Sequence, residues 1–143
     1  MLMKRTFNTQ INSNAINVWL LLSRLAIGAL MLSHGYPKLQ TLLSGNVQFA
    51  DPFGIGPVPS LALTVFAEFV CSILLILGLA TRLATIPLII TMLVAIFYAH
   101  SADPFGKKEL AVIYLTIFIG FLVLGPGRYS IDNFVAGKNK GRY

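Results

Sequence analysis

Four long apolar segments restrict the fold of this chain more than any other feature. They cover residues 17–39, 58–80, 82–100 and 109–124. A helix needs about 20 apolar residues to cross the hydrocarbon core of a bilayer, with some tolerance for tilt and local thinning. The fourth segment is short and the third contains Pro87, yet open strands are excluded because their backbone groups would stay unpaired in lipid. The sequence therefore predicts an all-α membrane protein, a bundle of four transmembrane helices.

Composition and charge support this class and exclude others. Of the 143 residues, 56% are apolar and only 11% are charged, too few charges to cover the surface of a soluble domain. The net charge of +6 does not indicate nucleic acid, because most of the positive charge flanks the apolar segments. The N-terminus lacks the pattern of a signal peptide. We divide the chain into an N-terminal cytoplasmic segment (1–16), a four-helix transmembrane domain (17–128) and a basic cytoplasmic tail (129–143).

The distribution of charge also predicts the orientation. One side would carry Lys4, Arg5, Arg82, Arg128, Lys138, Lys140 and Arg142. The other would carry Lys38, Lys107 and Lys108, together with Asp51, Asp103 and Glu109. Cytoplasmic segments carry an excess of lysine and arginine. The sequence therefore predicts a multi-pass protein of the cytoplasmic membrane with both termini inside.

The pentapeptide ADPFG occurs twice, at Ala50–Gly54 and at Ala102–Gly106. Both copies fall in predicted outer loops. They would mark two parallel helical-hairpin repeats, related by a pseudo-two-fold axis along the membrane normal, or they match by chance. Aspartate can accept hydrogen bonds from following backbone N–H groups, and proline and glycine favour turns. We interpret ADPFG as a membrane-surface turn, with a ligand site as the alternative.

Several ionisable residues fall within the predicted spans, and two of them lie well inside a span. Glu68 lies near the middle of the second span, and Arg24 lies within the first. Charges inside a bilayer need partners, so one hypothesis is a structural ion pair between Arg24 and Glu68. The other is that Glu68 is catalytic, a buried carboxylate that moves a proton.

A second polar group gathers near the outer face. His34, Lys38, His100 and Tyr114 are predicted at similar depth and could bind the polar head group of a ligand; the alternative is that they are ordinary interfacial residues. Both histidines end helices, where a porphyrin would be poorly enclosed, so haem is not expected. No set of residues has the spacing of a metal site, and the single cysteine, Cys71, excludes an internal disulfide.

Three stretches resemble the signatures of the DoxX family. They are LSRLAIGALMLSHGYPKL (Leu22–Leu39), AEFVCSILLILGLATRLATIPL (Ala67–Leu88) and GPGRYSIDN (Gly125–Asn133). The resemblance implies a small four-helix protein of prokaryotic plasma membranes. The family takes its name from a subunit associated with a thiosulfate:quinone oxidoreductase, and other members are linked to quinones, oxidative stress or sulfur-handling enzymes. The positions that match the signatures are Arg24, His34, Gly35, Lys38, Glu68, Gly78, Arg82, Gly125, Gly127 and Asp132.

The functional hypothesis follows from the resemblance and from the polar groups together. The chain would be an accessory subunit of a quinone-linked oxidoreductase, with a quinone or similar hydrophobic ligand between Glu68 and the outer cluster. Its partners would be the lipid bilayer, a redox or sulfur-handling protein, and further copies of itself. The alternatives are a non-catalytic anchor or assembly partner, whose buried charges only fix helix packing, and a small-solute transporter.

Overall fold

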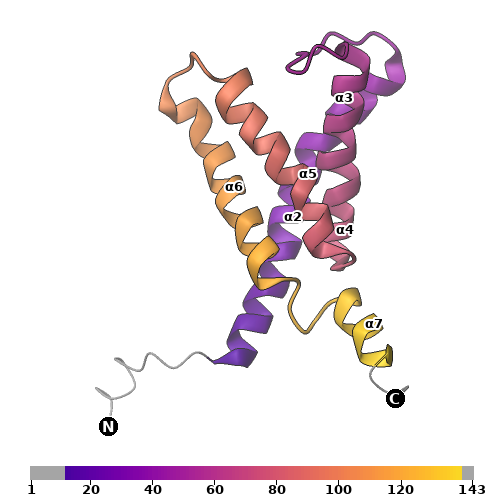
Figure 1. Cartoon of the computed structure of the whole chain (residues 1–143), viewed down its shortest axis with the longest axis vertical. Helices are drawn as coiled ribbons and strands as arrows, with labels where there is room; N and C mark the ends of the chain where they lie inside the picture. Colours follow the sequence, from indigo (N-terminus) through magenta and orange to yellow (C-terminus); the bar gives the residue numbers. More distant parts are fainter. Residues whose placement is uncertain (1–11, 140–143) are drawn as a thin grey trace.

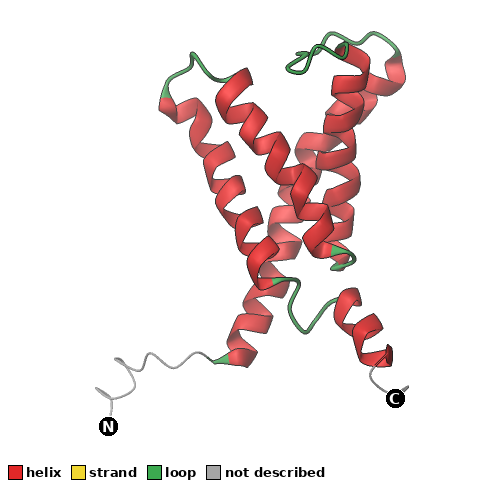
Figure 2. Ribbon diagram, in the orientation of Figure 1, coloured by secondary structure: helices red, strands yellow, loops and turns green. Residues whose placement is uncertain are grey.

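The computed structural model describes residues 12–139. These residues form helices joined by loops and contain no strand (Figure 2). Residues 1–11 and 140–143, with Lys4, Arg5, Lys140 and Arg142 of the predicted inner-side charges, lie outside the described residues. The elements in chain order are α2 (Ser13–Ser44), α3 (Pro57–Val65), η1 (Phe66–Cys71), α4 (Ser72–Leu77), α5 (Thr81–Val94), η2 (Ala95–Ala99), α6 (Phe105–Leu124) and α7 (Ile131–Asn139). The two η elements are π-helical turns that continue the α-helices before them.

The helices form two antiparallel pairs. Helix α2 packs along α3, η1 and α4, and α5 packs along α6 and η1. The two pairs lie close together at one end of the molecule and spread apart toward the end that carries the loops of both ADPFG copies (Figure 1). The start of α2 and helix α7 lie at the opposite end (Figure 1). The splayed arrangement leaves space between the pairs beside residues 49–53 and Glu68.

Three helices are long and apolar enough to cross a membrane: Ser13–Ser44, Pro57–Leu77 and Thr81–Ala99. The first three predicted segments are thus helices that can span a membrane, and the first extends beyond its predicted bounds at both ends. The Asn12 side chain accepts hydrogen bonds from the backbone of Asn14 (3.0 Å) and Ala15 (3.3 Å), and Gly45 ends the helix with φ of 75°. The fourth predicted segment is the helix α6. That α6 spans the membrane, and that both termini face the cytoplasm, stay predictions.

Close contact between backbones sets the register of the first helix pair. A Cβ atom on Gly35 would lie 2.7 Å from the carbonyl carbon and oxygen of Glu68. A Cβ atom on Gly28 would lie close to the Ile76 side chain and to the carbonyl oxygen of Ser72, and Gly78 lies against the side chain of Arg24. Because the two helices are antiparallel, Gly35 is level with Glu68, whereas Arg24 is level with the end of α4.

The predicted Arg24–Glu68 ion pair is therefore wrong. Arg24 lies 11 residues before Gly35, about 16 Å along the helix axis from the level of Glu68. Its guanidinium is buried and donates a hydrogen bond to the backbone carbonyl of Tyr129, beyond the end of α6. Glu68 instead pairs with Lys38. Arg24 thus holds the segment after α6 against the first helix pair, far from the predicted site.

The tight turn between α4 and α5 depends on Asp132 in α7. Gly78 and Ala80 adopt left-handed backbone conformations, with φ of 68° and 48°. The Asp132 carboxylate accepts hydrogen bonds from the backbone N–H of Ala80 (2.7 Å) and Thr81 (2.9 Å) at the start of α5. Its own N–H donates to the carbonyl of Gly78 (2.9 Å). A residue distant in sequence thus caps α5 and fastens α7 to the bundle.

Replacement of Asp132 by alanine should destabilise the fold through this cap. We expect the free energy of unfolding to fall by about 0.5–2 kcal/mol, the range for loss of a helix N-cap. The measurement is unfolding of the detergent-solubilised protein. Asp132→Asn, which keeps an acceptor oxygen, should lose less. Equal losses from the two variants would contradict the capping role.

Candidate functional site

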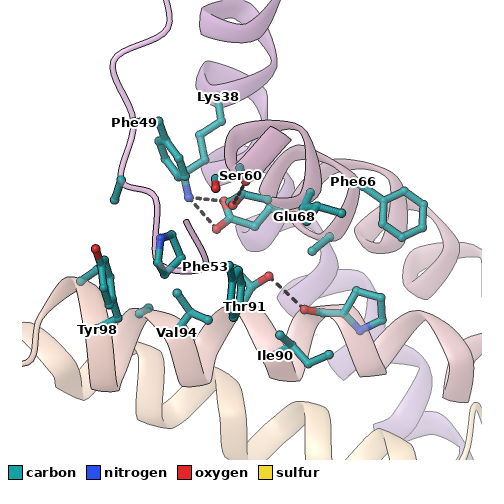
Figure 3. Close-up of a pocket in the computed structure, with 18 of the residues that line it drawn as sticks. Lys38, Phe49, Phe53, Ser60, Phe66, Glu68, Ile90, Thr91, Val94 and Tyr98 are labelled. Atoms are coloured by element: carbon teal, nitrogen blue, oxygen red, sulfur yellow. Dashed lines mark hydrogen bonds and ion pairs between the residues drawn. The ribbon is translucent and has the colours of Figure 1, made fainter. Parts of the chain in front are cut away.

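A cavity of about 470 Å³ lies between the two helix pairs; we call it cavity 1 (Figure 3). The loop after α2, the α3–η1 helix and the α5–η2 helix form its walls. Most of the lining is apolar or aromatic: Phe49, Ala50, Pro52, Phe53, Leu63, Phe66, Ala67, Pro87, Ile90, Val94, Ala95, Tyr98 and Ala99. The volume is within the range of about 300–1,000 Å³ that is usual for small-molecule sites. The composition suits a hydrophobic ligand with an aromatic ring.

Lys38 and Glu68 form an ion pair in the wall of cavity 1 (Figure 3). Lys38 Nζ lies 2.5 Å from Glu68 Oε1 and 2.6 Å from Oε2. The Glu68 side chain is 4% exposed and that of Lys38 is 32% exposed. A lysine ammonium has three N–H donors, and the carboxylate accepts two of them. One donor of Lys38 therefore remains for a further acceptor.

The serine and threonine side chains in this wall already donate hydrogen bonds within the protein, and His100 Nδ1 contacts Asp103 at 2.8 Å. Ser60 Oγ donates to Asp51 (2.8 Å), Thr64 Oγ1 donates to the carbonyl of Ser60 (2.9 Å), and Thr91 Oγ1 donates to the carbonyl of Pro87 (2.9 Å). Threonine bonds to a carbonyl one turn earlier are a local feature of helices. The ion pair is thus the main polar group that a ligand in cavity 1 would meet.

Local backbone features place these two charges together. Gly35 lets α2 approach η1 to backbone contact, and Lys38 follows it by about one helical turn, so its side chain reaches over Glu68. Glu68 itself lies in the π-helical turn η1, and the second such turn, η2, runs up to His100. Both π-helical turns contribute residues to cavity 1. Such turns within α-helices are frequent at functional sites.

A smaller cavity of about 140 Å³ lies on the other side of the ion pair; we call it cavity 2. It shares Lys38, Glu68, Ala95 and His100 with cavity 1. Its remaining lining residues are Met31, His34, Met92, Lys107, Leu110, Ala111 and Tyr114. The ring of His34 packs edge-on against Tyr114, with 6.0 Å between ring centroids.

The predicted site residues are thus distributed over two cavities. Lys38, Glu68 and His100 line both, whereas His34 and Tyr114 line cavity 2 only. Sequence reasoning missed the pairing of Lys38 with Glu68 and the aromatic wall. The wall includes Phe53 of the first ADPFG copy, so the pentapeptide itself was a signal for it. Its position in a loop favoured a surface turn over the alternative, a ligand site.

Both ADPFG copies form loops, as predicted, but their aspartates act differently. Asp51 accepts hydrogen bonds from the backbone of Ile55 (3.0 Å) and Gly56 (2.8 Å) and from Ser60. Asp103 instead contacts side chains, His100 Nδ1 at 2.8 Å and Lys107 Nζ at 3.7 Å. Whether the copies come from duplication or chance stays open.

Acidification should release the loop that Asp51 holds over cavity 1. Desolvation raises the pKa of this carboxyl, but hydrogen bonds from Gly56, Ser60 and Ile55 outweigh it and hold the pKa below its ordinary value. The carboxylate therefore stabilises the loop above the ordinary aspartate pKa of about 3.9, and this stabilisation is lost as the pH falls through the lowered pKa. Amide chemical shifts of Ile55 and Gly56 should titrate in that range. The same shifts in Asp51→Asn should show no such step.

Comparison with known proteins identifies the family of this chain. A family model described as DoxX matches residues 19–101. The chain belongs to the DoxX family. The match contains every residue that lines cavity 1, from Lys38 to His100, whereas α6 and α7 lie beyond it. This DoxX chain is therefore a membrane protein whose larger cavity lies entirely in the family region.

Three relatives cover most of this DoxX chain. The "Putative oxidoreductase CatD" of Bacillus subtilis is 30% identical over 133 residues, which are 90% of this chain and 96% of that protein. The "Inner membrane protein YqjF" of Escherichia coli is 31% identical over 126 residues, 85% of this chain and 95% of that protein. The "Uncharacterized membrane protein Rv3486" of Mycobacterium tuberculosis is 32% identical over 132 residues, 76% of each chain. No solved structure matches the chain significantly.

Proposed function

We propose that this DoxX protein binds a quinone in cavity 1 and acts as an accessory subunit of a quinone-linked oxidoreductase. The observation that carries the proposal is the buried Lys38–Glu68 ion pair in the wall of an aromatic, otherwise apolar cavity. A membrane quinone has a flat ring, an apolar tail and carbonyl oxygens that accept hydrogen bonds. Cavity 1 offers aromatic walls for the ring and the free donor of Lys38 for a carbonyl oxygen.

The two charged residues have distinct parts in this proposal. A bound quinone supplies the redox chemistry, in which its reduction to a hydroquinone takes two electrons from a redox partner protein and two protons. Lys38 orients the ring through a hydrogen bond to one carbonyl oxygen. Glu68, held 2.6 Å or less from Lys38 Nζ, exchanges a proton at that oxygen, with Lys38 stabilising the charge that remains on the carboxylate. The name of the Bacillus subtilis relative, an oxidoreductase, supports this class of activity.

Binding of a short-tailed quinone to the protein in nanodiscs tests the proposal. We expect saturable binding of a short-tailed ubiquinone or menaquinone, and a loss of affinity of about tenfold or more in Lys38→Met, since the charge-assisted hydrogen bond that Lys38 donates is worth about 1.5–3 kcal/mol. Val94→Trp, which fills cavity 1, should abolish binding. Glu109→Gln is the control, because Glu109 is exposed and lines neither cavity.

Unchanged quinone affinity in both Lys38→Met and Val94→Trp would overturn the proposal. If those variants instead lower stability or recovery of a partner protein, the chain is an anchor or assembly subunit. The full satisfaction of Glu68 by Lys38 is the observation that favours this second function.

A further inference from the structure

Two cavities with different linings meet at one ion pair. Lys38 and Glu68 face both, so the pair separates cavity 1 from cavity 2. Helix α5 presents neighbouring residues to opposite sides, Val94 to cavity 1 and Met92 to cavity 2. The Glu68 carboxylate can therefore contact a ligand in cavity 1 and a different group in cavity 2.

Cavity 2 has the lining of a hydrated space. Besides the ion pair, its titratable side chains are His34 from α2, His100 after η2, and Lys107 and Tyr114 from α6. Buried waters need about two to four polar partners each, and a volume of about 140 Å³ holds several waters. Cavity 1 offers fewer such partners for its size, because most of its larger lining is apolar or aromatic.

Cavity 2 also reaches the surface at the loop end of the molecule. His34 is exposed, and the Lys107 side chain is 67% exposed. Met31 and Met92, both buried, close the opposite end. The polar residues therefore run from an open mouth at Lys107 to the almost fully buried carboxylate of Glu68, where His34, next to Gly35, lies at the same level.

We propose that cavity 2 is a water-filled vestibule that carries protons between the aqueous phase at the loop end and Glu68. The use of these protons, exchange with a quinone in cavity 1, rests on the proposed function. Each proton that Glu68 delivers to a ligand oxygen is replaced by one from water in cavity 2, and the reverse holds for a proton released on hydroquinone oxidation. His34 and Tyr114 line the route and are positioning residues for its water, not groups that touch the ligand.

The proposal explains why an ionisable pair lies between two cavities of such different character. A proton acceptor that faced only the largely apolar cavity 1 could not re-equilibrate with water, because charged species do not cross an apolar wall readily. With cavity 2 on the side opposite the ligand, Glu68 can exchange a proton with water while the ligand stays in cavity 1.

Thiol labelling of single-cysteine variants tests the vestibule without any quinone. In a Cys71→Ala background, Met92→Cys places a thiol in cavity 2 and Val94→Cys places one at nearly the same depth in cavity 1. A charged, membrane-impermeant methanethiosulfonate reacts with thiolates, which form in water but not in apolar surroundings. We expect Met92→Cys to react at least about tenfold faster than Val94→Cys, since a shift of one pKa unit changes the thiolate fraction by about tenfold.

Three further variants make the labelling result decisive. Ser101→Cys, in the exposed loop, shows that the reagent is active, and Ala111→Phe in the Met92→Cys protein should block the vestibule and abolish its reaction. Ala111→Cys lines the same cavity nearer the mouth and replaces Met92→Cys if that variant does not fold.

An unreactive cavity 2 thiol, or equal rates in the two cavities, would overturn the vestibule. The labelling outcome is independent of quinone binding. A failure here leaves the proposed function standing, and a failure of quinone binding leaves the labelling result unchanged.

Discussion

Replacement of Gly35 by alanine is expected to lower the free energy of unfolding by about 1–3 kcal/mol, the cost of overpacking a close contact. The added Cβ would lie 2.7 Å from the carbonyl carbon and oxygen of Glu68 and 2.8 Å from the backbone nitrogen of Phe69. These are backbone atoms, so they cannot rotate aside, and α2 must move away from η1. The measurement is unfolding of the detergent-solubilised protein by a denaturing detergent.

Gly120→Ala is the matched control for this prediction. Gly120 also lies inside a helix, but a Cβ atom there would have no neighbour within 4 Å. Both substitutions gain the same helix propensity, about 1 kcal/mol in favour of alanine, so the difference between them isolates the helix–helix contact. We expect Gly120→Ala to be neutral or stabilising. A Gly35→Ala protein as stable as the control would contradict the backbone contact that sets the register.

Movement of α2 should also separate Lys38 from Glu68. Gly35→Ala should therefore weaken quinone binding even though Gly35 lines neither cavity. Gly28→Ala should have a smaller effect on stability, because its nearest obstacle is the flexible Ile76 side chain.

The sequence predicted the helices well because a bilayer leaves few alternatives. An apolar segment in lipid must satisfy its own backbone hydrogen bonds, so helix positions follow almost directly from hydropathy. The first helix begins at Ser13, four residues before the predicted residue 17, because Asn12 is its N-cap. The grouping of His34, Lys38, His100 and Tyr114, which all line cavity 2, also followed, because helix ends and loops set their depth.

The sequence did not reveal the partner of Glu68. Depth measured from the presumed end of a span placed Arg24 near Glu68, but α2 runs from Ser13 to Ser44 and is longer than a simple crossing requires. The register is set by the contact of Gly35 with Glu68, which depends on two backbones and not on either segment alone. Because the assumed register of the two helices was wrong, the predicted partner of Glu68 lay several helical turns from the actual partner, Lys38.

Cavity 1 could not be predicted from the periodicity of the sequence either. Its walls include two π-helical turns, η1 and η2. Each such turn adds one residue to a turn of its helix, and this leaves no distinct pattern of apolar residues in the sequence. The loop with Phe49 and Phe53 completes the wall, and its path depends on Asp51. These features arise only when distant segments are packed together.

Separate replacement of the two ion-pair residues should have unequal effects on stability. Lys38→Met leaves the almost fully buried carboxylate of Glu68 without its partner, and we expect a loss of about 3–5 kcal/mol, the range for breaking a buried pair. Glu68→Gln leaves Lys38 unpaired, but its side chain is 32% exposed and can extend toward water. We expect that variant to lose only about 1–3 kcal/mol.

The double variant separates the structural part of the pair from its part in binding. Lys38→Met with Glu68→Gln leaves no uncompensated charge, so its stability should recover toward that of the milder single variant, with a coupling energy of about 0.5–3 kcal/mol. Quinone affinity should not recover, because neither the free donor of Lys38 nor the carboxylate is restored. Unfolding and quinone binding are measured on the same four proteins. If affinity and stability instead rise and fall together, the pair serves only to hold α2 against η1, and the anchor function explains the protein better than the quinone site.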